Sequence, residues 1–243
     1  MTGLGTILNS AGIVFGGIVG RFAGKFLKPQ QQDALNKACG VSILFIAIAG
    51  AMEGMLKIEG NEISSGKSML VVLCLALGTL MGEIIGVEKG FERFGEWLRE
   101  KTGNGGNAGF VNAFVTASLT VSIGAMAIVG AIQDGLQGDA STLMVKSVLD
   151  CVIIVVMTSA LGTGAIFSAI PVFLFEGGMT LLAKWLAPLI TEAAVAHLSL
   201  IGSILIFCIG LNLTGGKKIR VANMLPALLV PPLWHVIRGI LPL

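Results

Sequence analysis

The stretch that decides the fold is AFVTASLTVSIGAMAIV, residues 113–129, which carries no charge and runs into GAIQDGLQGD, residues 130–139. An α-helix needs roughly 20 predominantly apolar residues to cross about 30 Å of hydrocarbon, and this stretch approaches that length. Asp134 stands where such a helix should be ending. The stretch therefore predicts a membrane-spanning helix, and it raises the question of whether its carboxylate is a site or a boundary.

Composition extends this prediction to the whole chain. Of 243 residues, 54% are hydrophobic and 12% are charged, with a mean hydropathy of +0.89, whereas soluble domains carry about 25% charged residues. A soluble chain of this length could not bury so much apolar surface in one core, so the lipid bilayer is the expected partner. The net charge of +2 argues against binding to nucleic acid.

Sequence motifs predict neither a cofactor nor an enzyme. The four cysteines stand singly in different apolar stretches, so they are interpreted as small packing residues and not as metal ligands. GxSxG, HExxH and P-loop motifs are all missing from the sequence. The first basic residue is Arg21, so the start lacks the basic region of a signal peptide and the first helix is expected to stay in the mature protein.

Apolar segments predict an all-α, polytopic membrane protein that forms a single domain over residues 1–243. Seven helices are expected, at residues 4–26, 38–56, 68–87, 110–134, 147–170, 192–213 and 221–241. An eight-helix alternative splits residues 147–190 in two. Residues 87–101 place Phe91, Phe94, Trp97 and Leu98 on one helical face, which predicts an amphipathic helix at the membrane interface.

A recurring order of motifs predicts three tandem two-helix repeats, in units of about 4–76, 77–160 and 161–243. Each unit begins with Leu-Gly-Thr, at Leu4, Leu77 and Leu161, and continues with GKFL, GEWL or AKWL and then an apolar helix. Two crossings per unit would make all three copies parallel. Lys and Arg are more numerous on the side of the amphipathic stretches, which is therefore expected to be cytoplasmic.

Charged residues recur at the predicted helix ends. Glu53 and Asp134 end apolar helices, and Lys67 and Lys146 begin the next ones. Each charge is unfavourable beside its own helix dipole, but a short hairpin would bring each acid near the following base. The pairs Glu53–Lys67 and Asp134–Lys146 are therefore predicted, either as plain salt bridges or as a charged vestibule around a polar pathway. The third unit has Asn212 in place of the acid.

Asp150 is the most informative polar residue. It lies one helical turn after Lys146, on the same face, and an uncharged run follows it. A carboxylate at the centre of a membrane helix costs about 2.5–3.5 kcal/mol and usually faces a bundle interior or a wet cavity. Asp150 is therefore a candidate for an ion or substrate pathway, unless Lys146 merely neutralises it near the surface. Asn223 lies one turn after Arg220, so the third unit also has a base followed by a polar residue, but the polar residue is an amide and not an acid.

Two further features concern backbone and amide groups. In FSAIPVFLFEGG, residues 167–178, Pro171 frees carbonyls of the preceding turn and Ser168 can satisfy one of them. This segment is either a break that lines a cavity, as in transporters, or a packing kink. Asn9 is expected to hydrogen-bond one helix to another.

The segments GAIQDGLQGD, KSVLD, FSAIPVFLF and IGLNLTGGKKIRVANMLPALL occur in an order that resembles a bacterial membrane family, domain of unknown function 554 (the YqgA/YdfK type). The resemblance covers nearly the entire chain. It implies a multi-pass protein of the bacterial cytoplasmic (inner) membrane, and it implies no established substrate. The family often has glutamine where Glu176 stands, so the resemblance gives Glu176 no general role.

Polar groups inside apolar helices favour transport as the function. The expected protein is a transporter or channel for an ion or small solute, linked to a small cation or proton through Asp150 and Asp134. The alternative is a non-transporting scaffold or sensor, in which the acids only form salt bridges within a dry interior. Glycine-rich faces such as GGIVG, residues 16–20, would join helices of one chain or the subunits of a homo-oligomer.

Overall fold

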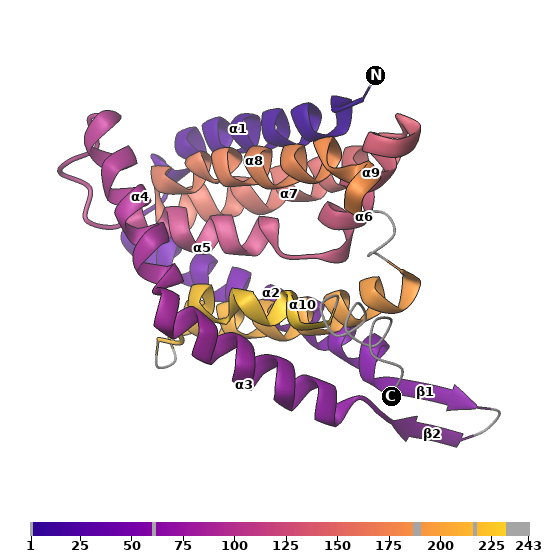
Figure 1. Ribbon diagram of the computed structural model, residues 1–243. Coiled ribbons are helices and arrows are strands. Elements are labelled where there is room, and N and C mark those ends of the chain that lie inside the picture. The colour runs from indigo at the N-terminus through magenta and orange to yellow at the C-terminus, as the bar shows by residue number, and fades with distance from the viewer. Residues whose placement is uncertain (1, 60–61, 187–190, 216–217, 232–243) are drawn as a thin grey trace.

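Two groups of helices lie side by side in the computed structural model, which describes residues 2–59, 62–186, 191–215 and 218–231 (Figure 1). The first group contains α1 (Leu4–Gly24), α5 (Phe110–Ser122), α6 (Ala125–Gln137), α7 (Ser141–Leu161), the 3₁₀ helix η1 (Thr163–Ser168) and α8 (Ala169–Leu181). The second contains α2 (Pro29–Met55), α3 (Ser68–Ile85), α10 (Glu192–Leu213) and the 3₁₀ helix η3 (Val221–Leu228).

Shorter elements join these helices. Figure 1 shows α4 (Val87–Lys101) at one end of both groups, and α9 (Ala183–Leu186) at the opposite end. An antiparallel hairpin of β1 (Leu56–Glu59) and β2 (Glu62–Ser65) connects α2 to α3, with Leu56 opposite Ser65. The amphipathic prediction for residues 87–101 is confirmed as a helix with the same bounds. Leu98 is buried, whereas Trp97 is half exposed, as suits a helix at an interface.

Among the described residues, six helices are long and apolar enough to cross a membrane: α1, α2, α3, α7, the η1–α8 pair and α10. A seventh span results if α5 and α6, which meet at a bend of 62°, count as one crossing. The prediction of a single helix over residues 147–170 is wrong, because α7 ends at Leu161 and Gly162, at φ 107°, turns the chain into η1. The alternative that splits residues 147–190 is therefore closer to the fold.

The final predicted segment, residues 221–241, differs as well. Its described part begins with the 3₁₀ helix η3, which contains Pro226, and residues 232–241 lie outside the described residues. Proline removes an amide donor from a helix, so an α-helix would lose a hydrogen bond there. Pro29 has the opposite effect at the start of α2, where it occupies the first turn and lets the helix begin before the predicted residue 38.

A stripe of glycines fixes the closest helix pair. Gly12, Gly16, Gly20 and Gly24 of α1 face Ser147, Cys151, Val155 and Ser159 of α7, in that order. Because both series advance by four residues in the same direction, α1 and α7 run parallel. A Cβ at Gly24 would lie 3.1 Å from the Ser159 carbonyl oxygen, and the other three positions are tighter still. Small residues that let backbones touch are typical of helix contacts in membranes.

The second group packs in the same manner with antiparallel helices. Gly40 of α2 meets Leu213 of α10, and Gly54 meets Leu200. Gly82 of α3 lies against the backbone of Asn223 in η3. Glycine contacts therefore set the distance between neighbouring helices in both groups.

This arrangement corrects the predicted orientation of the repeats. Leu4 begins α1 and Leu161 ends α7, and the two helices are parallel, so the first and third units start at opposite ends of the bundle. Accordingly, α4 and α9, which carry GEWL and AKWL, also lie at opposite ends (Figure 1). The three-repeat pattern in the sequence stays a prediction, but three copies pointing the same way do not describe the fold.

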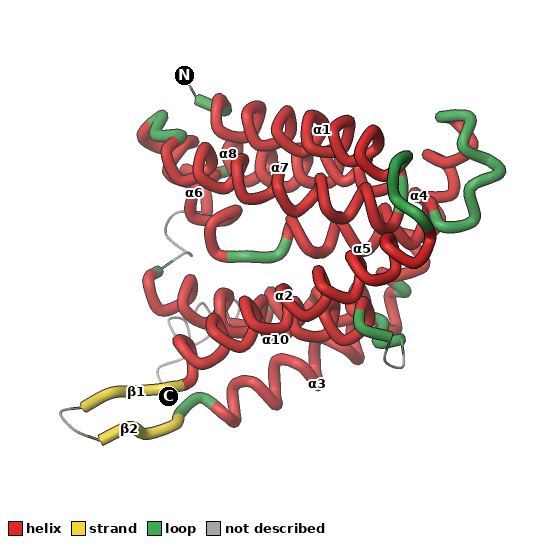
Figure 2. The backbone as a smooth tube through the Cα atoms, turned by 180° about the vertical axis from the view of Figure 1, so that it is seen from behind, coloured by secondary structure: helices red, strands yellow, loops and turns green. Residues whose placement is uncertain are grey.

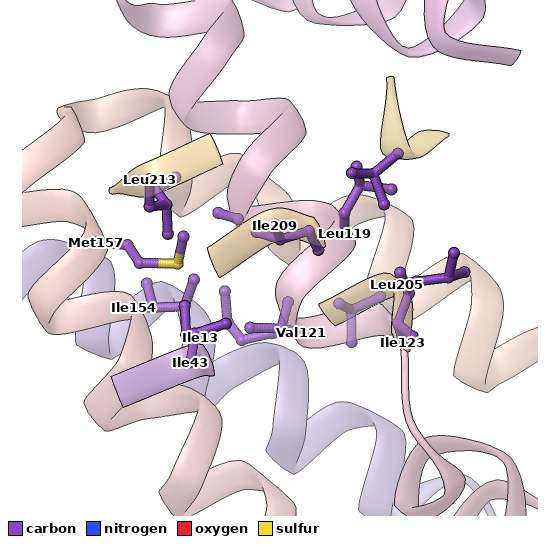
Figure 3. Close-up of a cluster of buried hydrophobic side chains, with 14 of the residues drawn as sticks. Ile13, Ile43, Leu119, Val121, Ile123, Ile154, Met157, Leu205, Ile209 and Leu213 are labelled. Atoms are coloured by element: carbon purple, nitrogen blue, oxygen red, sulfur yellow. The ribbon is translucent and has the colours of Figure 1, made fainter. Parts of the chain in front are cut away.

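An apolar layer connects the two helix groups (Figure 3). Leu119 and Val121 at the end of α5, together with Ile123 beyond it, gather with Leu205 and Ile209 of α10. The same cluster includes Ile13, Ile43, Ile154 and Met157, all of them buried. The layer lies where α5 stops, so it borders the polar groups that the end of this helix exposes.

Candidate functional site

The site begins at the interruption between α5 and α6. Figure 2 shows this connection as a non-helical link between two helices. Gly124 has φ 157° and ψ 152°, a conformation that residues with a side chain rarely adopt. The last four carbonyls of a helix have no amide partner within it. The break therefore places unpaired carbonyl groups of α5 inside the bundle, where other donors must satisfy them.

Lys146 supplies one of these donors. Its Nζ donates to the Val121 carbonyl oxygen at 2.6 Å and forms an ion pair with Asp150, one turn further along α7. The two residues are 6% and 4% exposed, respectively. An ammonium group at the C-terminal end of α5 also suits the dipole of that helix. The sequence offered this ion pair only as the alternative in which Lys146 neutralises Asp150 near the surface; the pair forms, but it is buried inside the bundle.

Two more helices complete the arrangement. Glu176 of α8 places Oε1 3.9 Å from Lys146 Nζ, and Asn9 of α1 donates from Nδ2 to the same oxygen at 2.8 Å. Both Glu176 and Asn9 are 0% exposed. We name these four residues, Asn9, Lys146, Asp150 and Glu176, the charged cluster. The prediction that Asn9 bonds one helix to another is confirmed, and its partner is an acid that the sequence did not assign.

The charged cluster is electrostatically costly. Moving a single ion from water into a protein interior carries a penalty of several kcal/mol even after relaxation, and ion pairing repays it only with good geometry. Here one ammonium group faces two carboxyl groups, and all four residues are at most 6% exposed. Such groups within membrane helices usually mark ion pathways or proton relays.

Asp134 has a different role from the one predicted. Its carboxylate accepts hydrogen bonds from the backbone amides of Gly3 at 3.0 Å and Gly5 at 2.9 Å. It therefore caps the first turn of α1, where amides lack helical partners and the dipole favours a negative charge. The predicted pair Asp134–Lys146 is wrong, because Lys146 instead pairs with Asp150 and Glu176.

Removing this cap should destabilise the protein. Replacing Asp134 with alanine leaves the partly buried Gly3 amide and the buried Gly5 amide without this acceptor, and we expect a loss of about 1–3 kcal/mol in the free energy of unfolding. Unfolding by a graded detergent titration, followed by circular dichroism, measures it. Asp139→Ala is the matched control, since Asp139 also accepts from a backbone amide, that of Ser141, but is exposed. Equal losses for both variants would contradict a special role for the cap.

The other predicted charged pair remains apart from the cluster. Glu53 is exposed near the end of α2, and Lys67 precedes α3 with φ 65°. The β1–β2 hairpin separates them, and within the described ranges no ion pair joins the two residues. Their proposed place in a pathway stays a prediction.

The remaining predicted residues make local contacts. Asn223 Oδ1 accepts from the Glu88 amide at 2.7 Å and so caps α4, and Asn212 exchanges two hydrogen bonds of 2.8 Å with the Ile219 backbone. Ser168 donates to the Ala165 carbonyl at 2.7 Å. Pro171 lies in the first turn of α8, where the missing amide is tolerated. The chain break lies at Gly162 and not at Pro171.

A cavity of about 470 Å³ opens between α4, α5 and α10. Glu88 and Glu92 line it, and Lys218 approaches them with distances from Nζ of 3.3 and 3.6 Å. The cavity also reaches Leu119, two residues before the carbonyl that Lys146 binds. The cavity therefore shares Leu119 with the apolar layer of Figure 3, and Val121 of the same layer supplies the carbonyl that Lys146 binds.

Sequence reasoning missed Glu176 as a member of the site. A signal was present, because Glu176 is a single acid within the apolar run PVFLFEGGM, and such residues usually face a partner inside the bundle. The partner could not be named, since Asn9 lies 167 positions earlier in the chain.

Comparisons with known proteins agree with these observations. The chain is 31% identical to the uncharacterized membrane protein YdfK of Bacillus subtilis (strain 168), over 94% of this chain and 93% of the relative. It is 26% identical to the uncharacterized protein YqgA of Escherichia coli (strain K12), over 93% of this chain and 94% of the relative. No solved structure matches the chain significantly. A family model matches residues 4–236, and the chain therefore belongs to the membrane-protein family described as protein of unknown function DUF554.

Proposed function

We propose that the protein is a membrane transporter for an ion or small solute, with the charged cluster as its binding centre. One observation carries this proposal: two carboxyl groups and one ammonium group lie buried together beside an interrupted helix. A purely structural core would be equally or more stable with apolar residues there, since buried ion pairs rarely stabilise more than well-packed hydrophobic side chains. Interrupted helices line the binding sites of many transporters.

Access to the centre would come from the cavity beside α4. Its lining includes Glu88 and Glu92 together with Lys218, which pairs with both, so a polar solute would meet both signs of charge there. Leu119 of the apolar layer lines the cavity and Val121 of the same layer binds Lys146, which supports placing the layer between the cavity and the charged cluster. A transporter must close one side of its binding site while the other is open, so this layer is suited to be a barrier that moves during transport. A permanently open channel would have no such barrier.

We further propose that the transporter resides in the bacterial cytoplasmic membrane. Two observations support a membrane location: the chain has helices long enough to cross a bilayer, and the B. subtilis relative is described as a membrane protein. Assembly into a homo-oligomer stays a prediction from the glycine-rich faces, of which the α1 stripe already packs within one chain.

A flux assay tests the proposed function. Purified protein in liposomes should exchange at least one of a panel of labelled small cations and polar solutes. Asp150→Asn should lower that flux at least about tenfold, because a tenfold loss corresponds to only about 1.4 kcal/mol of binding free energy and the variant deletes a buried charge. Asp139→Asn makes the same chemical change at an exposed position preceding α7 and should leave the flux unchanged.

Two results would count against the proposal. Unchanged flux in Asp150→Asn would remove Asp150 from the mechanism. Liposomes that exchange nothing from the panel, with folded protein present, would favour the non-transporting scaffold or sensor instead.

A further inference from the structure

Two buried oxygen atoms in the charged cluster have no hydrogen-bond partner. They are Oδ1 of Asn9 and Oε2 of Glu176, and the missing partner refers to the part of the chain that the structure describes. The other atoms of the same two groups are joined, since Asn9 Nδ2 donates to Glu176 Oε1 at 2.8 Å. Both side chains are 0% exposed. Leaving a buried polar atom unsatisfied costs about 1–3 kcal/mol, so two of them on one bonded pair require an explanation.

The balance of charges within the charged cluster also requires an explanation. Lys146 is the single basic group of the cluster, and its Nζ is already engaged by Asp150 and the Val121 carbonyl. The distance from Lys146 Nζ to Glu176 Oε1 is 3.9 Å. If both acids were ionised, the buried cluster would carry an uncompensated negative charge, which the low dielectric of a protein interior strongly disfavours.

Within the described residues, no other charged group near α8 removes this imbalance. Among the described elements packed against α8, α5 and η1 contain no titratable side chain. The carboxylate of Asp134 on α6 binds the amides of α1, and Lys184 of α9 and Arg21 of α1 are exposed. The charged groups that face Glu176 inside the bundle are therefore Lys146 and Asp150.

We propose that Glu176 holds an exchangeable proton on Oε2. A proton taken from water adds to this oxygen, forms an O–H bond and neutralises the carboxylate. The resulting acid can donate to Asn9 Oδ1 while its Oε1 continues to accept from Asn9 Nδ2. This closed ring of an acid and an amide satisfies both unpaired oxygens and balances the cluster, with one ammonium against one carboxylate.

The proposal deepens the proposed transport function and rests on it for its physiological meaning. Loss of the proton leaves a second negative charge beside Lys146, which must then divide its attraction between Asp150 and Glu176. The protonation state of Glu176 therefore changes how fully Lys146 neutralises Asp150, and with it the net charge that a solute meets at Asp150. Proton movement and solute binding are coupled in this way, and the transported species includes a proton.

Infrared spectroscopy of the protein in liposomes tests the proton site without any transport. The carbonyl stretch of a protonated carboxylic acid should be present at neutral pH and should shift in deuterated water. It should disappear in Glu176→Gln, whose amide preserves the hydrogen bonds with Asn9, and persist in Asp139→Asn, which changes an exposed carboxylate. A wild-type spectrum without the band, or a band that Glu176→Gln keeps, would overturn the proposal.

Solute uptake into liposomes, driven by a pH gradient, provides a second test of the proposal. Glu176→Gln should lower this uptake at least tenfold relative to wild type, and Asp139→Asn should not change it. Full pH-driven uptake in Glu176→Gln would overturn the coupling role. A Glu176 band in a protein that transports nothing would support the proton site and contradict the transport function, so the two failures are distinguishable.

Discussion

Replacing Lys146 with methionine is expected to lower the free energy of unfolding by about 3–5 kcal/mol, because removal of one partner strands a buried charge. Asp150 would lose its ion pair and the Val121 carbonyl its donor, inside a region where both residues of the pair are at most 6% exposed. The same substitution at Lys37, whose ion pair with Asp33 lies on the surface, should cost less than about 1 kcal/mol. Graded detergent unfolding of both variants measures the difference.

A double variant separates the ion pair from the rest of the packing. Lys146→Met combined with Asp150→Leu removes both charges, and it should recover most of the stability lost in Lys146→Met, since buried pairs replaced by apolar residues are often neutral. Flux should not recover, because the double variant lacks the proposed binding groups. A double variant that is less stable than Lys146→Met would show that the pair contributes more than mutual neutralisation.

Replacing Gly16 with leucine is expected to have the other large effect. An added Cβ would collide with the backbone carbonyl of Cys151, which cannot move aside as a flexible side chain could. Separation of α1 from α7 would also disturb Asn9, which lies on the same helix as Gly16. Overpacking costs about 1–3 kcal/mol and occasionally more, and we expect the free energy of unfolding to fall by about 3 kcal/mol or more. A shift in the midpoint of graded detergent unfolding measures this loss.

Gly178 provides the matched control within another membrane helix. A Cβ at this position of α8 would meet no atom within 4 Å, so Gly178→Leu should change stability by no more than about 1 kcal/mol, in the stabilising direction, because leucine favours a helix over glycine. Equal destabilisation at both positions would contradict the close contact between α1 and α7.

Hydropathy and local spacing predicted much of this fold. The charge-free stretches predicted spans at α1, α3 and α10 within a few residues, and the amphipathic pattern predicted α4 with its bounds. The spacing of Lys146 and Asp150 placed them on one helix face, since residues four apart share a face, and the structure joins them in an ion pair. These features depend on neighbours in the sequence, which a single chain displays directly.

The predictions that failed concern contacts between segments that are far apart in the sequence. Asp134 was expected to pair with the next base along the chain, but its partners are amides 129 and 131 positions away. Glu176 gained a role only through Asn9 and Lys146 on other helices. The break at Gly162 was missed because the residues on both sides are apolar, and hydropathy averaged over a window does not register a change of direction.

The parallel pairing of α1 with α7 also imposes an order on synthesis. The ribosome completes α1 long before α7 and α8, and Glu176 follows Asn9 by 167 positions. During that interval the first helix must wait in lipid, or against an insertion factor, with its amide group and glycine face uncovered. Assembly of this bundle can therefore finish only after α8 has been translated.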